Sequence, residues 1–325
     1  MRRVLLAAAL LMAAGSAAGL DLQGHRGARG LLPENTLPAF AGALSLGVST
    51  LELDTAVTRD GVIVVSHDST LNPDITRNPD GTWIARRDIA IHALTWKELQ
   101  AHDVGRIRPL SLYAQRFPEQ QPLDGTRIPR LADVFALVRR AGNETVRFNI
   151  ETKISPEQPR LAPSPEAFAR ALIEEIRRER LESRVTIQSF DWRTLQAVQK
   201  VAPEIATAYL TVQQSWLDNV RAGQAASPWT AGFHVGNHGG SLPRMVKAAG
   251  GAIWSPHFAE LTRGQLREAH RLGLKVLVWT VNDPSDIARL IDWGVDGIIS
   301  DYPDRLRRLA ADRGLALPPA TAVTP

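Results

Sequence analysis

Leu51-Glu52-Leu53-Asp54 is the stretch that decides the fold of this chain. Successive side chains of a strand point to opposite faces, so the two leucines share one face and the two carboxylates share the other. Alternate residues of a strand lie roughly 6–7 Å apart. Carboxylates held this close and away from water are costly unless a cation or a proton lies between them. The stretch therefore predicts either a solvated surface strand or a buried acidic site backed by leucines.

Histidines stand at strand ends on both sides of this stretch. Gly24-His25-Arg26-Gly27 follows a short strand at 20–23, and Ser66-His67-Asp68 follows the apolar run 62–65. Singly, each histidine could be an ordinary loop residue, and Asp68 could cap a turn. Together, two acids, two histidines and an arginine at strand ends form a constellation suited to phosphate chemistry.

Length and composition allow one large barrel or two ordinary domains. The chain has 325 residues, of which 44% are hydrophobic and 22% are charged, as in an ordinary globular protein. A formal charge of +4 without a basic stripe bearing aromatics gives no reason to expect a nucleic-acid partner. The absence of cysteine excludes a disulfide scaffold, a cysteine nucleophile and a thiolate metal site.

Residues 1–19 have the pattern of a cleaved secretory signal peptide rather than an uncleaved anchor. Arg2 and Arg3 precede the apolar run 4–14, and Ser16-Ala17-Ala18 supplies small residues for cleavage. The apolar run is short for a membrane span. We therefore expect a periplasmic or secreted bacterial protein with no stable membrane insertion after cleavage.

Strands and helices alternate along residues 20–312. After the acidic strand, further strands are expected at 146–151, 185–189, 205–210, 252–255, 275–281 and 297–300, with a helix between each pair. This alternation predicts a parallel sheet. About eight strands predict an α/β fold, a (β/α)8 TIM barrel with a small insertion after the second strand. A doubly wound sheet is the alternative, but its glycine-rich dinucleotide fingerprint is missing.

Three segments interrupt the alternation. Residues 71–130 are rich in turns and read as an insertion that caps the site. Residues 213–240 are irregular, with a helix expected near 216–222 and an added strand near Phe233. Residues 313–325 read as a flexible C-terminal tail.

Chemistry-bearing residues cluster at the predicted strand ends, where barrels place their active sites. Three carboxylates are oxygen ligands suited to Mg²⁺ or Ca²⁺, and two histidines can share acid and base work. An arginine can grip a phosphate with two nitrogens, and a lysine can add charge. Simple alternatives exist: Trp279 could be an ordinary residue of the hydrophobic core, and Glu151 could merely pair with Lys153. The set is Glu52, Asp54, Glu151, His25, His67, Arg26, Lys153 and Trp279.

From about Gln23 to Leu306, the chain resembles the glycerophosphodiester phosphodiesterase family. Eight motifs occur in the family's order, and each alone is weak. They are His25-Arg26-Gly27, Pro33-Glu34-Asn35-Thr36, Glu52-Leu53-Asp54, Thr58-Arg59-Asp60-Gly61, His67-Asp68, Asn149-Ile150-Glu151-Thr152-Lys153, Val278-Trp279-Thr280-Val281-Asn282 and 294–303.

The resemblance implies a role for each residue of the set. It implies Glu52, Asp54 and Glu151 as ligands of one divalent cation, Ca²⁺ or Mg²⁺. It implies His25 and His67 as the catalytic acid–base pair, without saying which is the base. It implies Arg26 and Lys153 as phosphate contacts, and Trp279 as an apolar wall beside glycerol.

The implied function is metal-dependent hydrolysis of small glycerophosphodiesters to glycerol 3-phosphate and an alcohol. The route runs through a cyclic phosphate formed by the neighbouring glycerol hydroxyl, or by direct attack of water. One rival is a phospholipase-D-like enzyme acting on intact lipids, for which Trp83, Ile84 and Trp96 could form an apolar lip. Another is a non-catalytic phosphoester-binding protein, which would need no second histidine. The head group and the oligomeric state are left open by the sequence.

Overall fold

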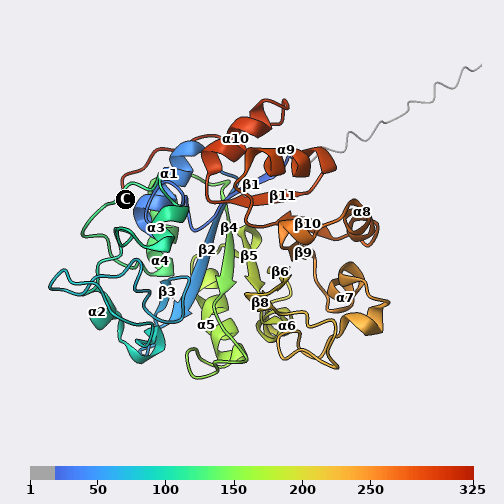
Figure 1. Cartoon of the computed structure of the whole chain (residues 1–325), viewed down its shortest axis with the longest axis horizontal. Coiled ribbons are helices and arrows are strands. Elements are labelled where there is room, and N and C mark those ends of the chain that lie inside the picture. Colours follow the sequence, from blue (N-terminus) through green and yellow to red (C-terminus); the bar gives the residue numbers. More distant parts are fainter. Residues whose placement is uncertain (1–18) are drawn as a thin grey trace, which may run out of the picture.

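Leu51 and Leu53 face the helices that surround a closed parallel barrel, while Glu52 and Asp54 face its interior. The computed structural model describes residues 19–325, and Figure 1 shows its strands and the helices around them. Both leucines are fully buried in the main hydrophobic core. Burying each contributes about 1.5–3 kcal/mol, which favours this orientation of the strand over the reverse one.

Eight parallel strands form the ring, in the order β1-β2-β4-β5-β6-β9-β10-β11, and β11 pairs with β1 to close it. The predicted TIM barrel is therefore confirmed. The ring strands are β1 Asp21–Gly24, β2 Thr50–Val57, β4 Arg147–Thr152, β5 Val185–Ser189, β6 Ala206–Thr211, β9 Ile253–Pro256, β10 Lys275–Val278 and β11 Gly297–Ser300.

A helix follows each ring strand and packs outside it. The first is capped by Thr36, whose side chain accepts from Ala39 N, and ends at Gly47 with φ 81°. The eight helices are α1 Leu37–Leu46, α4 Leu131–Arg140, α5 Pro165–Arg178, α6 Trp192–Val201, α7 Leu242–Ala248, α8 Arg263–Arg271, α9 Pro284–Trp293 and α10 Pro303–Ala311. No helix of residues 19–325 combines the length and the apolar character needed to cross a membrane.

The insertion follows a short strand outside the ring. Strand β3, Ile63–Val65, runs antiparallel to β2, and the chain then forms α2, Trp96–Leu99, and α3, Leu112–Arg116. Ile84 is buried in a small core of the insertion and Trp96 packs against it. Ile84 and Trp96 therefore do not form the apolar lip that the lipid-enzyme alternative could use, because their side chains stabilise the insertion itself.

The irregular segment 213–240 differs from its prediction. Instead of a helix near 216–222, a hairpin forms from β7, Gln213–Gln214, and β8, Leu217–Asp218. The Asn219 amide accepts from Val212 N at 2.9 Å and donates to Leu210 O at 3.0 Å, and such local bonds compete with helix formation. Near Phe233 the chain makes a short 3₁₀ turn at Val235–His238 rather than a strand.

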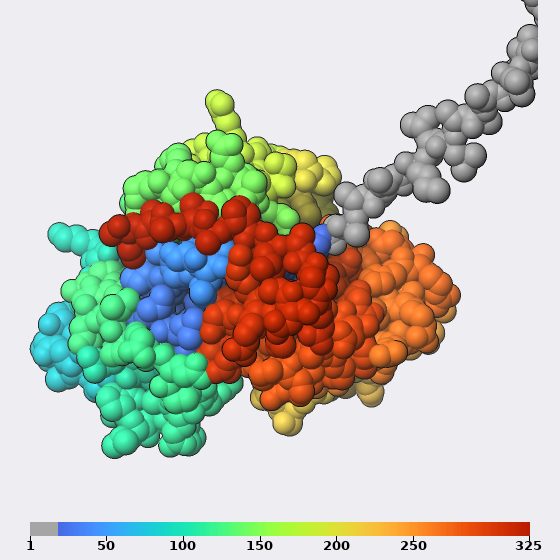
Figure 2. All heavy atoms as spheres, turned by 90° about the horizontal axis from the view of Figure 1, so that it is seen from above, coloured from blue at the N-terminus to red at the C-terminus, as the bar shows by residue number. Residues whose placement is uncertain are grey.

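Residues 313–325, for which we expected flexibility, lie across the barrel. Thr321 N donates to Leu44 O at 2.8 Å, and Asn143 Nδ2 donates to Thr321 Oγ1 at 2.9 Å. Leu315, Leu317 and Val323 pack against the main core. Figure 2 shows this red segment crossing the blue residues of α1. The chain end thus covers apolar surface of α1 and α4.

Candidate active site

The register of β2 and β4 brings three carboxylates together. Asp54 is paired with Glu151 and Glu52 with Asn149, and residues paired in this way point to the same face. One carboxylate oxygen from each of Glu52, Asp54 and Glu151 lies within 4.8 Å of the others. All three residues are buried. The strand geometry inferred from Leu51–Asp54 therefore produces a compact acidic cluster.

The pKa values of the three carboxyl groups are shifted in different directions. Burial, and then the charge of Asp54, raise the pKa of Glu52 well above its usual range. Burial raises the pKa of Glu151 to about 7, although the Lys153 ammonium opposes the shift. Burial also disfavours ionised Asp54, but His67, Lys153 and Arg26 outweigh it and hold the pKa of Asp54 well below its usual range. The pKa values of Asp54 and Glu52 are therefore shifted in opposite directions, which favours the ionised form of Asp54 and disfavours that of Glu52.

Amides fix the orientation of Glu52. Gln188 Nε2 donates to Glu52 Oε1 at 2.8 Å, and Arg26 N donates to Glu52 Oε2 at 2.8 Å. Asn149 Nδ2 in turn donates to Gln188 Oε1 at 3.0 Å and to Gln23 Oε1 at 2.9 Å. A chain of amides from β1, β4 and β5 therefore holds the carboxylate in one position across the barrel interior.

His25 is held by an aspartate from the last strand end. Its Nδ1 lies 2.6 Å from Asp301 Oδ1, and its Nε2 lies 3.9 Å from Glu52 Oε2. Burial opposes the charge of Asp301, but Arg29 and His25 hold its pKa well below the usual range. Ionised Asp301 accepts a hydrogen bond from the Nδ1–H of His25, so the lone pair of this imidazole is on Nε2, on the side of Glu52. Burial, then Arg29, lowers the pKa of His25 to about 4, so the imidazole is neutral near pH 7.

Arg26 is clamped between two acids. Its Nη1 donates to Glu34 Oε1 at 2.7 Å, and its Nε lies 3.2 Å from Asp54 Oδ2. Arg26 and Asn35 both have left-handed backbone, with φ 49° and 56°, in the loop between β1 and α1. Such conformations cost about 1–3 kcal/mol each and recur where a site needs them. The Asn35 amide donates to Asp54 Oδ2 at 2.9 Å, so the turn ties this loop to the cluster.

Two further predicted residues act on the cluster: Lys153 contacts it, and, although burial acts the other way, the charge of His67 lowers the pKa of Asp54. Lys153 Nζ lies 2.7 Å from Glu151 Oε1 and 3.7 Å from Asp54 Oδ1. His67 follows β3 with its side chain 32% exposed, and its Nδ1 lies 3.2 Å from Asp68 Oδ1. Burial, then Arg26 and Lys153, lower the pKa of His67. Asp68 therefore contacts Nδ1 of His67 as Asp301 contacts Nδ1 of His25, but over a longer distance and in a more exposed place.

Trp279 leads from the charged cluster to an aromatic wall. Its ring lies 5.2 Å from Phe190 and 6.3 Å from Trp216, measured between ring centroids. Lys153 Nζ lies 5.8 Å from the Phe190 ring. Trp279 is half-buried, with its indole N–H donating to Ser255 O at 2.9 Å. The wall thus begins beside the lysine that contacts Glu151.

Several site residues had no assigned role from the sequence. Asp301, Arg29 and Glu34 surround the predicted histidine and arginine, and Tyr113 of the insertion donates its hydroxyl proton to Glu34. Asp301 had a usable signal, because it is an acid at the end of the last predicted strand. Tyr113 had none, because it lies in irregular chain.

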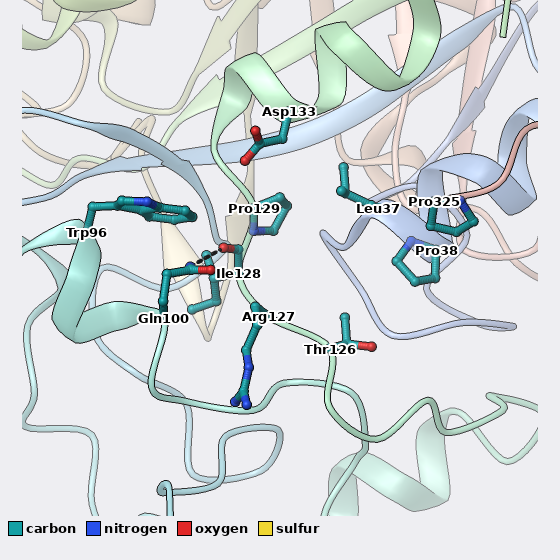
Figure 3. A pocket seen from close by; sticks show the side chains of 10 residues that line it. All are labelled: Leu37, Pro38, Trp96, Gln100, Thr126, Arg127, Ile128, Pro129, Asp133 and Pro325. Atoms are coloured by element: carbon teal, nitrogen blue, oxygen red, sulfur yellow. Dashed lines mark hydrogen bonds between the residues drawn. The ribbon is translucent and has the colours of Figure 1, made fainter. Parts of the chain in front are cut away.

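A separate cavity of about 250 Å³ lies between α1, α2 and the segment that leads to α4 (Figure 3). Most of its lining is apolar, with Arg127 at one side. None of the clustered carboxylates or histidines borders it, so it is not part of the candidate site. Its lining residues are Leu37, Pro38, Trp96, Gln100, Thr126, Arg127, Ile128, Pro129, Asp133 and Pro325.

Relatives of known family resemble this chain over most of its length. A glycerophosphodiester phosphodiesterase of Caldanaerobacter subterraneus subsp. tengcongensis is 31% identical over 290 residues, covering 89% of this chain and 97% of the relative. One from Bacillus subtilis is 28% identical over 293 residues, covering 88% of this chain and 84% of the relative.

Solved structures agree with the fold. A Silicibacter pomeroyi protein that carries the family name provisionally is 37% identical, with TM-score 0.81, covering 93% of this chain and 96% of its own. An Oleispira antarctica phosphodiesterase, solved with the product sn-glycerol-3-phosphate, is 23% identical, with TM-score 0.65, covering 90% and 97%. The model of the glycerophosphoryl diester phosphodiesterase family matches residues 25–305. The chain therefore belongs to the glycerophosphoryl diester phosphodiesterase family and is an enzyme of that class.

Proposed function

We propose that this enzyme is a metal-dependent phosphodiesterase that hydrolyses glycerophosphodiesters to glycerol 3-phosphate and an alcohol. The observation that carries the proposal is the cluster of Glu52, Asp54 and Glu151 beside two histidines that are each bonded to an aspartate. The product held by the Oleispira antarctica relative has the chemistry expected of this reaction.

The carboxylate cluster fits one divalent cation, Ca²⁺ or Mg²⁺. Asp54 Oδ1 is buried without a hydrogen-bond partner, with the Lys153 ammonium 3.7 Å away, and a bound cation would satisfy it. The donors are all oxygens, which are the ligands that these hard ions prefer. Glu52, Asp54 and Glu151 would hold the ion. When bound, the ion supplies positive charge that polarises a phosphoryl oxygen and an attacking hydroxyl.

The cationic side chains and the aromatic wall position the substrate. Arg26 and Lys153 would place two positive charges at the phosphate, the former already aligned by Glu34. Trp279 would lie along the carbon chain of glycerol. Because these groups are fixed by neighbours before substrate arrives, little side-chain freedom is lost on binding.

The two histidines exchange protons with the reacting oxygens. One imidazole accepts the proton of the attacking hydroxyl, and the other, which enters the step as imidazolium, donates its Nε2 proton to the departing alkoxide. The attacking group is the neighbouring glycerol hydroxyl, giving a cyclic phosphate that water then opens with the two roles reversed. Each imidazole has its Nδ1 on an aspartate, which keeps Nε2 for this exchange.

Product analysis tests the proposed reaction. The purified enzyme with Ca²⁺ or Mg²⁺ should release glycerol 3-phosphate from several glycerophosphodiesters, together with the matching alcohol. Intact phospholipids and phosphomonoesters serve as comparison substrates. Release of phosphatidic acid from intact lipids, without turnover of the small diesters, would favour the phospholipase-D-like alternative. Binding of the diesters without turnover under any metal condition would favour a non-catalytic protein.

We also propose an exported, periplasmic or secreted location. The proposal is supported by the signal-like pattern of residues 1–19, of which residues 1–18 lie outside the described structure.

A further inference from the structure

Two leucines project from the insertion beside the site. Leu110 is 95% exposed and Leu112 is 79% exposed. Within residues 19–325, only three other large apolar side chains are exposed, and one of them, Leu123, belongs to the same insertion. Single exposed leucines are ordinary, but a pair at one loop tip is a local apolar surface.

The backbone holds this pair outward. Leu110 has φ 62°, a left-handed conformation that is costly for a leucine. The next residue, Ser111, caps α3 by accepting from Ala114 N at 3.0 Å. A strained residue followed at once by a helix cap fixes the direction of both leucine side chains.

The opposite side of the same segment is fixed to the site. Tyr113 contacts Glu34, and Arg29 Nη1 lies 3.3 Å from the Tyr113 hydroxyl. Phe117 is buried, with the Arg29 guanidinium 4.5 Å from its ring centroid. The segment therefore has an inner face that contacts the site loop and an outer face on which Leu110 and Leu112 are exposed. Figure 2 shows teal-green residues of the insertion forming a lobe at the lower left of the molecule.

Unpaired arginines flank the leucines. Arg108 and Arg116 are exposed, and neither makes an ion pair within residues 19–325. By contrast, nearby Arg106 pairs with Asp124, and Glu119 is taken by Arg305. The Arg116 guanidinium lies 5.8 Å from the Phe117 ring centroid. Leucines flanked by two arginines that make no ion pair within the described residues match a surface that is apolar inside and anionic outside. A second protein copy would need an interface of roughly 800 Å² per partner, far more than two leucines supply.

We propose that residues 108–116 dock the enzyme on anionic membrane surfaces. Leu110 and Leu112 enter the acyl boundary, and Arg108 and Arg116 contact the lipid phosphates. Because Tyr113 joins this segment to Glu34, docking would hold the site next to the bilayer, where lipid-derived diesters are released. The docking claim concerns binding alone and does not depend on the reaction proposed above.

Vesicle co-sedimentation of the full chain tests the proposal. Probes are phosphatidylcholine vesicles with and without phosphatidylglycerol. The wild-type chain should bind the anionic vesicles, and the L110S/L112S variant should bind them at least about tenfold more weakly. Arg108→Gln with Arg116→Gln should remove the preference for anionic lipid. Val201→Ser changes another exposed apolar residue, on α6, and should bind like the wild type. All variants share one N-terminus, so its contribution cancels.

A gain-of-binding variant guards against misfolding. Leu110→Trp should bind anionic vesicles more tightly than the wild type, because tryptophan favours the membrane interface. If the circular dichroism of this variant matches that of the wild type, misfolding does not explain the tighter binding. Turnover of soluble diesters should stay the same in all of these variants. Equal vesicle binding by wild type and L110S/L112S would overturn the proposal. A shift from dimer to monomer in L110S/L112S, without a change in vesicle binding, would assign the leucines to a contact between copies instead.

Discussion

Asp54 on β2 and Glu151 on β4 are register partners whose carboxylates share one ammonium group. Lys153 Nζ lies 3.7 Å from Asp54 Oδ1 and 2.7 Å from Glu151 Oε1. Arg26 also contacts Asp54, with Nε 3.2 Å from Oδ2, but Glu52 adds a third buried acid to the cluster. Burial raises the pKa of Glu151 to about 7, so near neutral pH the free enzyme keeps part of a proton there, which a divalent cation would displace.

Cation binding should consequently release up to one proton, with less released as pH rises, and affinity should rise with pH from about 6 to about 8. The sign follows because a cation binds the deprotonated carboxylates, and burial raises the pKa of Glu151 to about 7. Calorimetric titration in buffers of different ionisation enthalpy measures both quantities. Glu174→Gln, an exposed change on α5, is the control and should behave like the wild type. A pH-independent affinity without proton release would mean that the carboxylates are all ionised beforehand.

Asp301→Asn should lower kcat by at least about a hundredfold while KM changes little. An amide cannot fix the proton on His25 Nδ1 as the carboxylate does, so Nε2 would lose its role as the exchanging nitrogen. Steady-state kinetics on one glycerophosphodiester measures the split. Asn282→Ala is the matched control, because it removes another 2.7 Å contact of Asp301 without touching His25. Equal losses in both variants would indicate a general structural role.

A substrate with the neighbouring glycerol hydroxyl replaced by hydrogen should bind nearly as well as the natural diester. Arg26 and Lys153 would still hold its phosphate. Its turnover should be at least roughly a hundredfold slower, because the positioned proton transfer has lost its donor. Comparison of KM and kcat for the two substrates decides. Near-normal turnover of the deoxy substrate would show direct attack by water, with the same residues in place.

The mature protein isolated from its native host should begin at Gly19 or Leu20. Strand β1 starts at Asp21, so cleavage there would leave the barrel whole. N-terminal sequencing of the secreted or periplasmic fraction is the measurement. An intact Met1 in that fraction would argue for an uncleaved anchor.

Strand periodicity accounts for what the sequence could predict. Leu51-Glu52-Leu53-Asp54 and 147–152 alternate strictly, and alternation specifies which face each side chain occupies. Once parallel pairing is assumed, strand-end acids from both must meet. The barrel and the carboxylate cluster could therefore be predicted from the sequence alone.

The sequence could not predict the contacts that form when the barrel closes or when the insertion folds. His25 and Asp301 are 276 residues apart and meet only because β11 pairs with β1. Tyr113 reaches Glu34 from a segment without periodicity. The hairpin at 213–218 depends on hydrogen bonds between the Asn219 side chain and the backbone, and no local sequence pattern predicts these bonds.

Removal and return of the cation test the central claim most directly. After chelation, with metal loss checked by elemental analysis, hydrolysis of a glycerophosphodiester should cease, and added Ca²⁺ or Mg²⁺ should restore it. The Glu52→Gln variant, with unchanged circular dichroism, should need at least roughly tenfold more cation for the same recovery. Full turnover by the verified metal-free enzyme, or recovery of Glu52→Gln at the wild-type cation concentration, would contradict the account.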